Sequence, residues 1–223
     1  MIPTAAHLSG IQAVIFDMDG TLVDSEPYTG MSVRRLLDAQ GIADPDLDMS
    51  AFHGCTWQAI SDALAARHPR LAGVCTPDGL EAVFEDLWEE TPPPFILGAK
   101  EAMAAAKAVA RTAICTSSRS AAVTRLVSAR GLGPHLDGVV CADDFGPSKP
   151  DPACFLLTAE RLGVAPARCL VFEDSVAGQT AAARAGMAVV GIGPLRTGDH
   201  APRWAIPHYA ALAPGFFAEI TRG

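Results

Sequence analysis

The pattern of apolar and polar positions divides the chain into two kinds of segment. Residues 11–16 (IQAVIF) form a short apolar run that ends at two aspartates, which predicts a buried strand followed by a polar loop. Later apolar runs have the same form, and stretches with apolar residues at helical spacing separate them. We expect the further strands at 112–116, 138–142, 168–172 and 187–192. Strands that alternate with helices favour right-handed crossovers and a parallel sheet covered by helices on both faces.

Between the first two predicted strands the pattern is helical only. Apolar residues recur at helical spacing within 32–40, 56–67 and 78–90, and Gly and Pro residues separate these stretches. Thr91 and the prolines that follow it form a stiff connector out of this region. We therefore expect an α/β protein in which a helical insert, 24–95, interrupts a core made of 1–23 and 96–223.

Composition narrows the class of protein further. The 223 residues are 49% apolar and 19% charged, which excludes a disordered or fibrous chain. The net charge of −8 disfavours binding to nucleic acid or to an anionic membrane, and no apolar stretch approaches the ~18 residues of a membrane span. The N-terminal segment lacks the features of a secretion signal and the six cysteines form no CxxC pair, so we expect a cytoplasmic protein with reduced thiols. The oligomeric state is left open.

The polar residues that follow the predicted strands supply the candidate chemistry. Ligands of open α/β sheets bind outside the carboxyl ends of the strands. In chain order these positions hold Asp17, Asp19 and Thr21, then Thr116, Ser117 and Ser118, then Lys149, and finally Glu173 and Asp174. Each feature also has an ordinary structural interpretation: an aspartate-rich turn, a strand-end hydroxyl, a solvated lysine or a helix N-cap. Their succession at one strand end after another favours a single site.

Charge balance predicts what such a site binds. Four ionised carboxylates repel one another unless cations offset them, and Mg²⁺, which prefers oxygen ligands, does so together with the ammonium of Lys149. A site of this kind binds an anion, and phosphate is the natural candidate. Asp17 and Asp19 stand two residues apart, so one can attack phosphorus while the other passes a proton to the leaving oxygen. Thr116 can donate to a phosphoryl oxygen, and Lys149 can neutralise it.

Four segments of the chain carry a family resemblance. They are FDMDGTLVDSE (16–26), ICTSS (114–118), SKPDPACF (148–155) and VFEDSVAGQTAAARAGM (171–187). Together they resemble the motifs of the haloacid dehalogenase superfamily, and more narrowly its branch of sugar-phosphate phosphatases and β-phosphoglucomutase. The resemblance implies a Rossmann-like three-layer core with an inserted all-helical cap, at 24–95, that selects the substrate.

The same resemblance implies a role for each core residue. Asp17 becomes phosphorylated and Asp19 is the acid and base, while Thr116 and Lys149 bind the phosphoryl group. The Asp17 carboxylate, the Asp19 backbone carbonyl and Asp174 hold Mg²⁺, with Glu173 close by. The remaining candidates for substrate contact are Thr21, Ser117, Ser118 and Arg119 in the core, and His53 and Trp57 in the cap. A lone histidine such as His53 is more often a surface or core residue than a substrate ligand. Trp57 fits two roles equally well, packing inside the cap and stacking on a sugar.

Departures from the family's patterns separate its branches. Asp19 argues against a dehalogenase, which lacks this second aspartate, and the absence of lysine from 24–95 argues against a phosphonate-cleaving enzyme. A mutase of this family carries an arginine where Trp57 stands and a histidine where Thr29 stands. Arg119 keeps the mutase hypothesis open, because a basic residue there can hold a distal phosphate.

Three functions from different classes remain to be compared. The favoured one is a Mg²⁺-dependent phosphatase that hydrolyses a small phosphorylated metabolite, a sugar or polyol phosphate, through an aspartyl phosphate. The alternative is a β-phosphoglucomutase-like hexose-phosphate mutase, which depends on a bisphosphate. The third is a non-enzymatic phosphoryl-accepting receiver module. The chain length, the helical insert and the position of Asp17 after the first strand disfavour the receiver.

Overall fold

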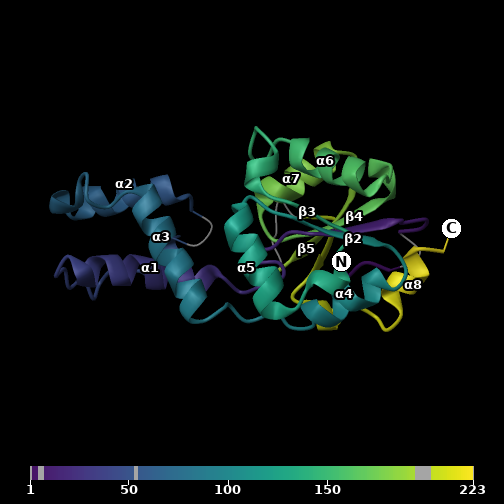
Figure 1. The fold of residues 1–223 in the computed structure, drawn as a ribbon, viewed down its shortest axis with the longest axis horizontal. Helices are drawn as coiled ribbons and strands as arrows, with labels where there is room; N and C mark the ends of the chain where they lie inside the picture. Colours follow the sequence, from purple (N-terminus) through teal and green to yellow (C-terminus); the bar gives the residue numbers. More distant parts are fainter. Residues whose placement is uncertain (1, 5–7, 53–54, 194–201, 223) are drawn as a thin grey trace. The chain divides into compact units, whose positions relative to one another are not determined.

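A six-stranded parallel sheet forms the centre of the larger part of the protein (Figure 1). The computed structural model describes residues 2–4, 8–52, 55–193 and 202–222. In chain order the strands are β1 (Ala13–Phe16), β2 (Arg111–Cys115), β3 (Gly138–Val140), β4 (Cys169–Glu173), β5 (Ala188–Ile192) and β6 (Trp204–Ile206). Their order in space is β3-β2-β1-β4-β5-β6, so β1 and β4 are neighbours at the centre. The predicted α/β class with a parallel sheet is confirmed.

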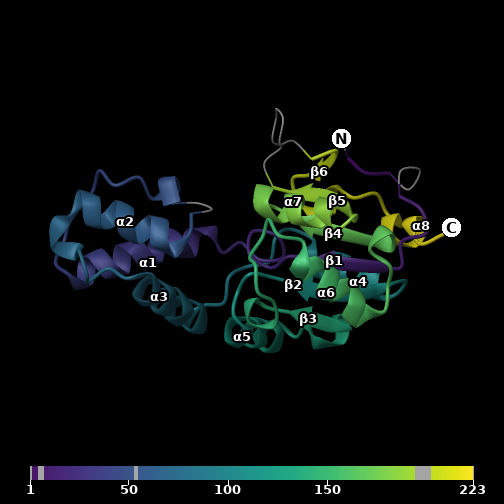
Figure 2. The same ribbon diagram turned by 90° about the horizontal axis from the view of Figure 1, so that it is seen from above.

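Helices lie on both faces of this sheet, which makes a three-layer core (Figures 1 and 2). The helices of the core are α4 (Ala99–Lys107), α5 (Ser120–Arg130), α6 (Ala153–Leu162), α7 (Val176–Arg184) and α8 (Phe216–Ile220). Side chains from α6 and α7 share a buried cluster with Ile15 of β1 and Val171 of β4. Successive strand residues point to opposite faces, and Phe172 accordingly contacts Phe217 of α8, with ring centres 6.0 Å apart. The helix α4 packs against α8 on that second face.

The chain divides into two compact units, one of Met1–Asp24 with Phe95–Gly223 and the other of Ser25–Pro94. Each division lies one residue from the boundary expected from the sequence. The second unit contains α1 (Glu26–Ala39), α2 (Trp57–Arg67) and α3 (Pro77–Glu90) and has its own buried apolar cluster, which includes Leu37, Leu64 and Leu80. Among the described residues, no helix has both the length and the apolar character needed to cross a bilayer.

Local signals explain where the helices of the smaller unit begin. The side chain of Thr56 accepts a hydrogen bond from the backbone N–H of Ala59, and Thr76 accepts one from Gly79, so each threonine caps the helix that follows it. Pro77 occupies the first position of α3. A backbone N–H at this position has no partner within the helix, so proline, which lacks one, fits there. These caps fix the start of α2 and α3 within the insert.

Candidate active site

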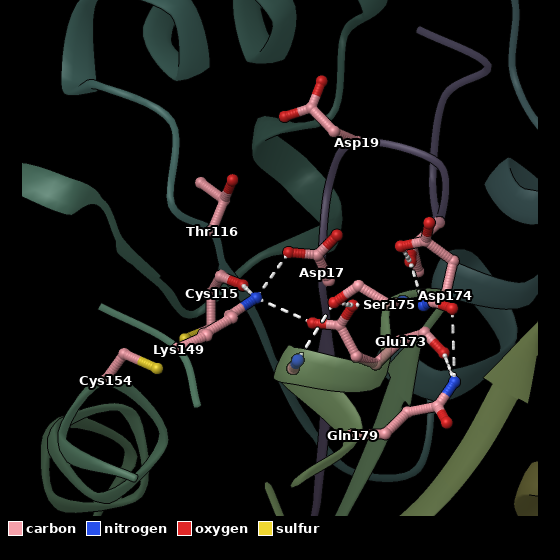
Figure 3. Close-up of polar contacts among 12 residues, drawn as sticks. Asp17, Asp19, Cys115, Thr116, Lys149, Cys154, Glu173, Asp174, Ser175 and Gln179 are labelled. Atoms are coloured by element: carbon pink, nitrogen blue, oxygen red, sulfur yellow. Dashed lines mark hydrogen bonds and ion pairs between the residues drawn. The ribbon is translucent and has the colours of Figure 1, made fainter. Parts of the chain in front are cut away.

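The predicted core residues meet at the carboxyl edge of the sheet (Figure 3). Because β1 and β4 are parallel neighbours with Phe16 paired to Phe172, the residues that follow these strands come side by side. The backbone N–H of Asp17 donates to the carbonyl of Phe172 at 3.0 Å, which aligns the two strand ends. Asp17 therefore lies next to Glu173 and Asp174, although more than 150 positions separate them in the chain.

Lys149 supplies the positive charge of the site. Its side chain is buried, and Nζ lies 2.6 Å from Asp17 Oδ1 and 2.7 Å from Glu173 Oε2. The same ammonium donates to the carbonyl of Cys115 at 3.3 Å and lies over the ring of Phe155, 5.1 Å from its centre. Burial by itself would lower the pKa of Lys149, but the charges of the two carboxylates raise it well above its ordinary value. The lysine is therefore held in its charged form.

Three carboxylates crowd around one point. Asp17, Glu173 and Asp174 each place an oxygen within 4.8 Å of the other two. Burial, and then the charge of Glu173, raise the pKa of Asp17 well above its ordinary value in spite of Lys149, and the same two causes raise the pKa of Asp174 to about 7. One ammonium does not balance three carboxylates, whereas the ammonium and a hard divalent cation together do, and such a cation prefers oxygen ligands. The donor set therefore fits an ion such as Mg²⁺.

The loop after β1 is shaped around Asp174. A Cβ on Gly20 would overlap the Asp174 carboxylate, and the positive φ of this residue also favours glycine. Thr21 Oγ1 donates to Asp174 Oδ1 at 3.1 Å and accepts from the Asp174 backbone N–H at 3.1 Å. Thr21 is fully buried, so its expected contact with substrate is corrected: the hydroxyl positions Asp174 instead.

Glu173 anchors the lysine rather than standing open to solvent. Its Oε2 pairs with Lys149, and its Oε1 accepts from the backbone N–H and the hydroxyl of Ser175, both at 2.9 Å. Ser175 Oγ accepts in turn from the backbone N–H of Gly178 and so caps α7. A Cβ on Gly178 would overlap the Glu173 carboxylate, so this helix approaches the site through a glycine.

Sequence reasoning missed the contributions of α7 to the site. Gln179 is buried, and its Nε2 donates to the backbone carbonyls of Glu173 at 3.0 Å and Asp174 at 3.3 Å (Figure 3). Gly178, described above, was missed as well, whereas the helix N-cap expected at 173–175 is present at Ser175. The signal in the sequence was a single large amide side chain among the small apolar residues of this helix, where burial calls for hydrogen-bond partners.

The loop after β2 brings two of the predicted hydroxyl groups into the site. Thr116 is buried, and its Oγ1 accepts from the backbone N–H of Ser118 at 3.0 Å. Ser118 Oγ donates to Asp19 Oδ2 at 2.6 Å, which joins the loops after β1 and β2. Ser117 and Arg119, the other two candidates on this loop, have exposed side chains.

The two candidates for substrate contact in the helical unit are Trp57 and His53. Trp57 is half-buried, and its ring packs edge-on against Phe84 at 5.3 Å between ring centres. Phe84 also contacts Tyr28 and Trp88, so these four rings form an aromatic cluster inside this unit. The structure thus gives Trp57 a packing role. His53 lies outside the described residues.

Comparison with known proteins identifies the family. A model of the haloacid dehalogenase-like hydrolases matches residues 11–186. This span is more than half of the chain and includes Asp17, Thr116, Lys149 and Asp174. The chain belongs to the haloacid dehalogenase-like hydrolases. The resemblance stated from the four motifs is confirmed, and the protein is an enzyme.

Individual proteins match along most of the chain. The fructose-1-phosphate phosphatase YqaB of Escherichia coli K12 is 33% identical over 181 residues, which cover 80% of this chain and 95% of that protein. Hexitol phosphatase B of the same organism is 30% identical over 204 residues, covering 88% and 89% of the two chains. A solved β-phosphoglucomutase from Clostridium difficile has a TM-score of 0.73 over 95% of this chain and 97% of that one. At 22% identity, that likeness shows a shared fold.

Proposed function

We propose that this hydrolase is a Mg²⁺-dependent phosphatase of small phosphate monoesters, with sugar or polyol phosphates as its substrates. The contact of the Lys149 ammonium with Asp17 Oδ1 at 2.6 Å, beside the carboxylate of Asp174, carries the proposal. This arrangement brings three things to one point: a nucleophile, a cationic group for the phosphoryl oxygens and a site for a metal cation. The substrate class is supported by the relatives named fructose-1-phosphate phosphatase and hexitol phosphatase B.

The two aspartates after β1 divide the chemistry between them. A carboxylate oxygen of Asp17 attacks phosphorus, so that an aspartyl phosphate forms as the ester P–O bond breaks, and Asp19 gives a proton to the leaving alkoxide. In the second half, Asp19 accepts a proton from water as the water oxygen attacks phosphorus. This step releases inorganic phosphate and restores the Asp17 carboxylate. The hydrogen bond from Ser118 holds Asp19 in place between the two loops.

The other groups of the site bind the phosphoryl oxygens. Thr116 accepts a hydrogen bond from Ser118 through its hydroxyl oxygen, so its O–H is left to donate to a phosphoryl oxygen. Lys149 offsets the charge on that oxygen and on the nucleophile. Asp17, Asp174 and the backbone carbonyl of Asp19 would hold Mg²⁺, which supplies positive charge that offsets the carboxylates and attracts the phosphate dianion.

A phosphate-release assay with matched variants tests this function. We expect Mg²⁺-dependent release from hexose and hexitol phosphates that stops in excess chelator and returns when Mg²⁺ is restored. Asp17→Asn should abolish turnover, and Asp19→Asn should lower it about 10²- to 10⁴-fold. Asp137→Asn, the same change at the amino end of β3, should keep wild-type turnover. With an activated aryl phosphate, Asp19→Asn should still release a burst of leaving group and gain phosphate on the peptide that contains Asp17.

Three outcomes would contradict the proposal. Full activity in excess chelator would exclude the metal, and phosphate trapped on a peptide without Asp17 would exclude the nucleophile. A strict requirement for a sugar bisphosphate, with isomerisation in place of phosphate release, would identify a mutase.

A further inference from the structure

Tyr209 carries a buried hydroxyl group that the chemistry above does not use. The residue begins the short turn Tyr209–Ala211, after β6, and is 3% exposed. No group of the described part of the chain forms a hydrogen bond with its hydroxyl. The other tyrosine, Tyr28, is satisfied, because its hydroxyl donates to the carbonyl of Thr91 at 2.8 Å. A buried hydroxyl without a partner costs about 1–3 kcal/mol and is uncommon in native proteins.

The ring of Tyr209 packs against the two strand residues that stand just before the acidic cluster. Its centre is 6.0 Å from the ring of Phe16 and 5.2 Å from the ring of Phe172, the strand residues that precede Asp17 and Glu173. Side chains alternate along a strand, so Asp174, two positions after Phe172, starts from the face on which Tyr209 packs.

The acidic cluster also acts on the phenol electrostatically. Burial first, and then the charges of Asp17, Asp174 and Glu173, raise the pKa of Tyr209 well above its ordinary value. The phenol is therefore neutral and keeps its proton, so its hydroxyl is available as a hydrogen-bond donor. A neutral donor close to buried carboxylates stabilises them without adding to the charge of the site.

We propose that Tyr209 is a positioning residue of the metal site. Its hydroxyl donates, through one bridging water molecule, to the carboxylate of Asp174 and holds it in the arrangement that binds the cation. A bridging water fits the observations, because the buried hydroxyl belongs to a ring that packs on the face from which Asp174 starts, and it forms no direct hydrogen bond within the described residues. Groups behind the ligands of a metal commonly fix their orientation and raise affinity in this way. The inference rests on the proposed function, since it assumes a cation at this cluster.

The substitution Tyr209→Phe tests the role with little change of shape. We expect the variant to stay folded in chelator and to unfold at a temperature close to that of wild type, because the change keeps the ring that packs against Phe16 and Phe172. Its dissociation constant for Mg²⁺, measured by titration calorimetry, should rise about fivefold or more. Tyr28→Phe is the matched control, because it removes a partnered hydroxyl in the other unit. That control should be less stable than wild type but bind Mg²⁺ with unchanged affinity.

A spectroscopic measurement on the wild-type sequence gives a second test. The chain has two tyrosines, so protein labelled with 3-fluorotyrosine should give two ¹⁹F resonances, which Tyr28→Phe assigns. We expect Mg²⁺ to move the Tyr209 resonance and to leave that of Tyr28 in place. Wild-type protein that binds no Mg²⁺ would overturn the metal-dependent function and this inference together. Mg²⁺ binding and phosphatase activity in wild type, with unchanged affinity in Tyr209→Phe and no movement of the Tyr209 resonance, would overturn the inference alone.

Discussion

At the scale of single residues, Gln179 connects α7 to the backbone of the acidic loop. Its two amide hydrogen bonds go to the carbonyls of Glu173, the last residue of β4, and of Asp174. We expect Gln179→Leu to lower the free energy of unfolding by about 2 kcal/mol, because it removes two buried hydrogen bonds, and to weaken Mg²⁺ binding as Asp174 loses its support. Gln58→Leu, which breaks an exposed bond to Asp62, should cost only a few tenths of a kcal/mol. Urea denaturation and Mg²⁺ titration measure both effects. Equal losses in the two variants would refute this role.

At the scale of elements, Asp137 ties α4, β2 and β3 together at the amino edge of the sheet. Its carboxylate accepts from Lys107, Arg111 and the backbone N–H of Thr112 at 2.7–2.9 Å. Burial opposes ionisation, but these donors prevail and lower the pKa of Asp137 to about 2. The contribution to stability is therefore complete above about pH 4 and is lost as the pH falls towards 2.

The matching variant isolates this contribution. Asp137→Asn should be about 1–2 kcal/mol less stable than wild type at pH 7, after allowance for solvent around Lys107 and Arg111. The difference between the two proteins should shrink between pH 4 and pH 2, where wild type loses the ionised carboxylate. Unfolding by urea at a series of pH values measures it. A difference that stays constant over this range would show that the carboxylate charge does not contribute.

At the scale of the whole molecule, each unit has its own apolar core and the proposed metal site belongs to the larger one. Mg²⁺ binding should stabilise only the unit that contains the site. The expected gain is about 2.7 kcal/mol when the Mg²⁺ concentration is 100 times the dissociation constant. In Trp204→Phe the remaining tryptophans, Trp57 and Trp88, both report on the helical unit. We expect Mg²⁺ to raise the melting temperature followed by circular dichroism and to leave the tryptophan fluorescence transition in place. A common shift of both signals would mean that the two units unfold as one.

We further propose that the helical unit, Ser25–Pro94, selects the substrate, since the core residues assigned to the chemistry, Asp17, Asp19, Thr116 and Lys149, act on the phosphoryl group. Exchange of this segment for the corresponding one of hexitol phosphatase B tests the assignment. The hybrid should keep Mg²⁺-dependent phosphate release and shift its preference towards hexitol phosphates. A preference that stays with the core would contradict it.

The sequence alone predicted five of the six strands of the described sheet and named the candidate chemical groups of the site. Apolar runs that end in polar residues mark strands and their carboxyl ends, because burial and strand termination are local properties that neighbouring residues encode. Asp17, Asp19, Lys149, Glu173 and Asp174 could therefore be named as one site, and the helical insert could be bounded to within a residue.

Only the tertiary structure decided how these groups are held. The order of strands puts β1 beside β4. This pairing brings Thr21 into contact with Asp174, and it brings Asp17 and Glu173 together so that Lys149 pairs with both. Gln179 reaches the backbone of the acidic loop from α7, and Tyr209, which lies outside the four motifs, packs against Phe16 and Phe172 from the turn after β6. Hydrogen-bond partners far apart in the chain depend on strand order and register, which no local stretch of sequence specifies.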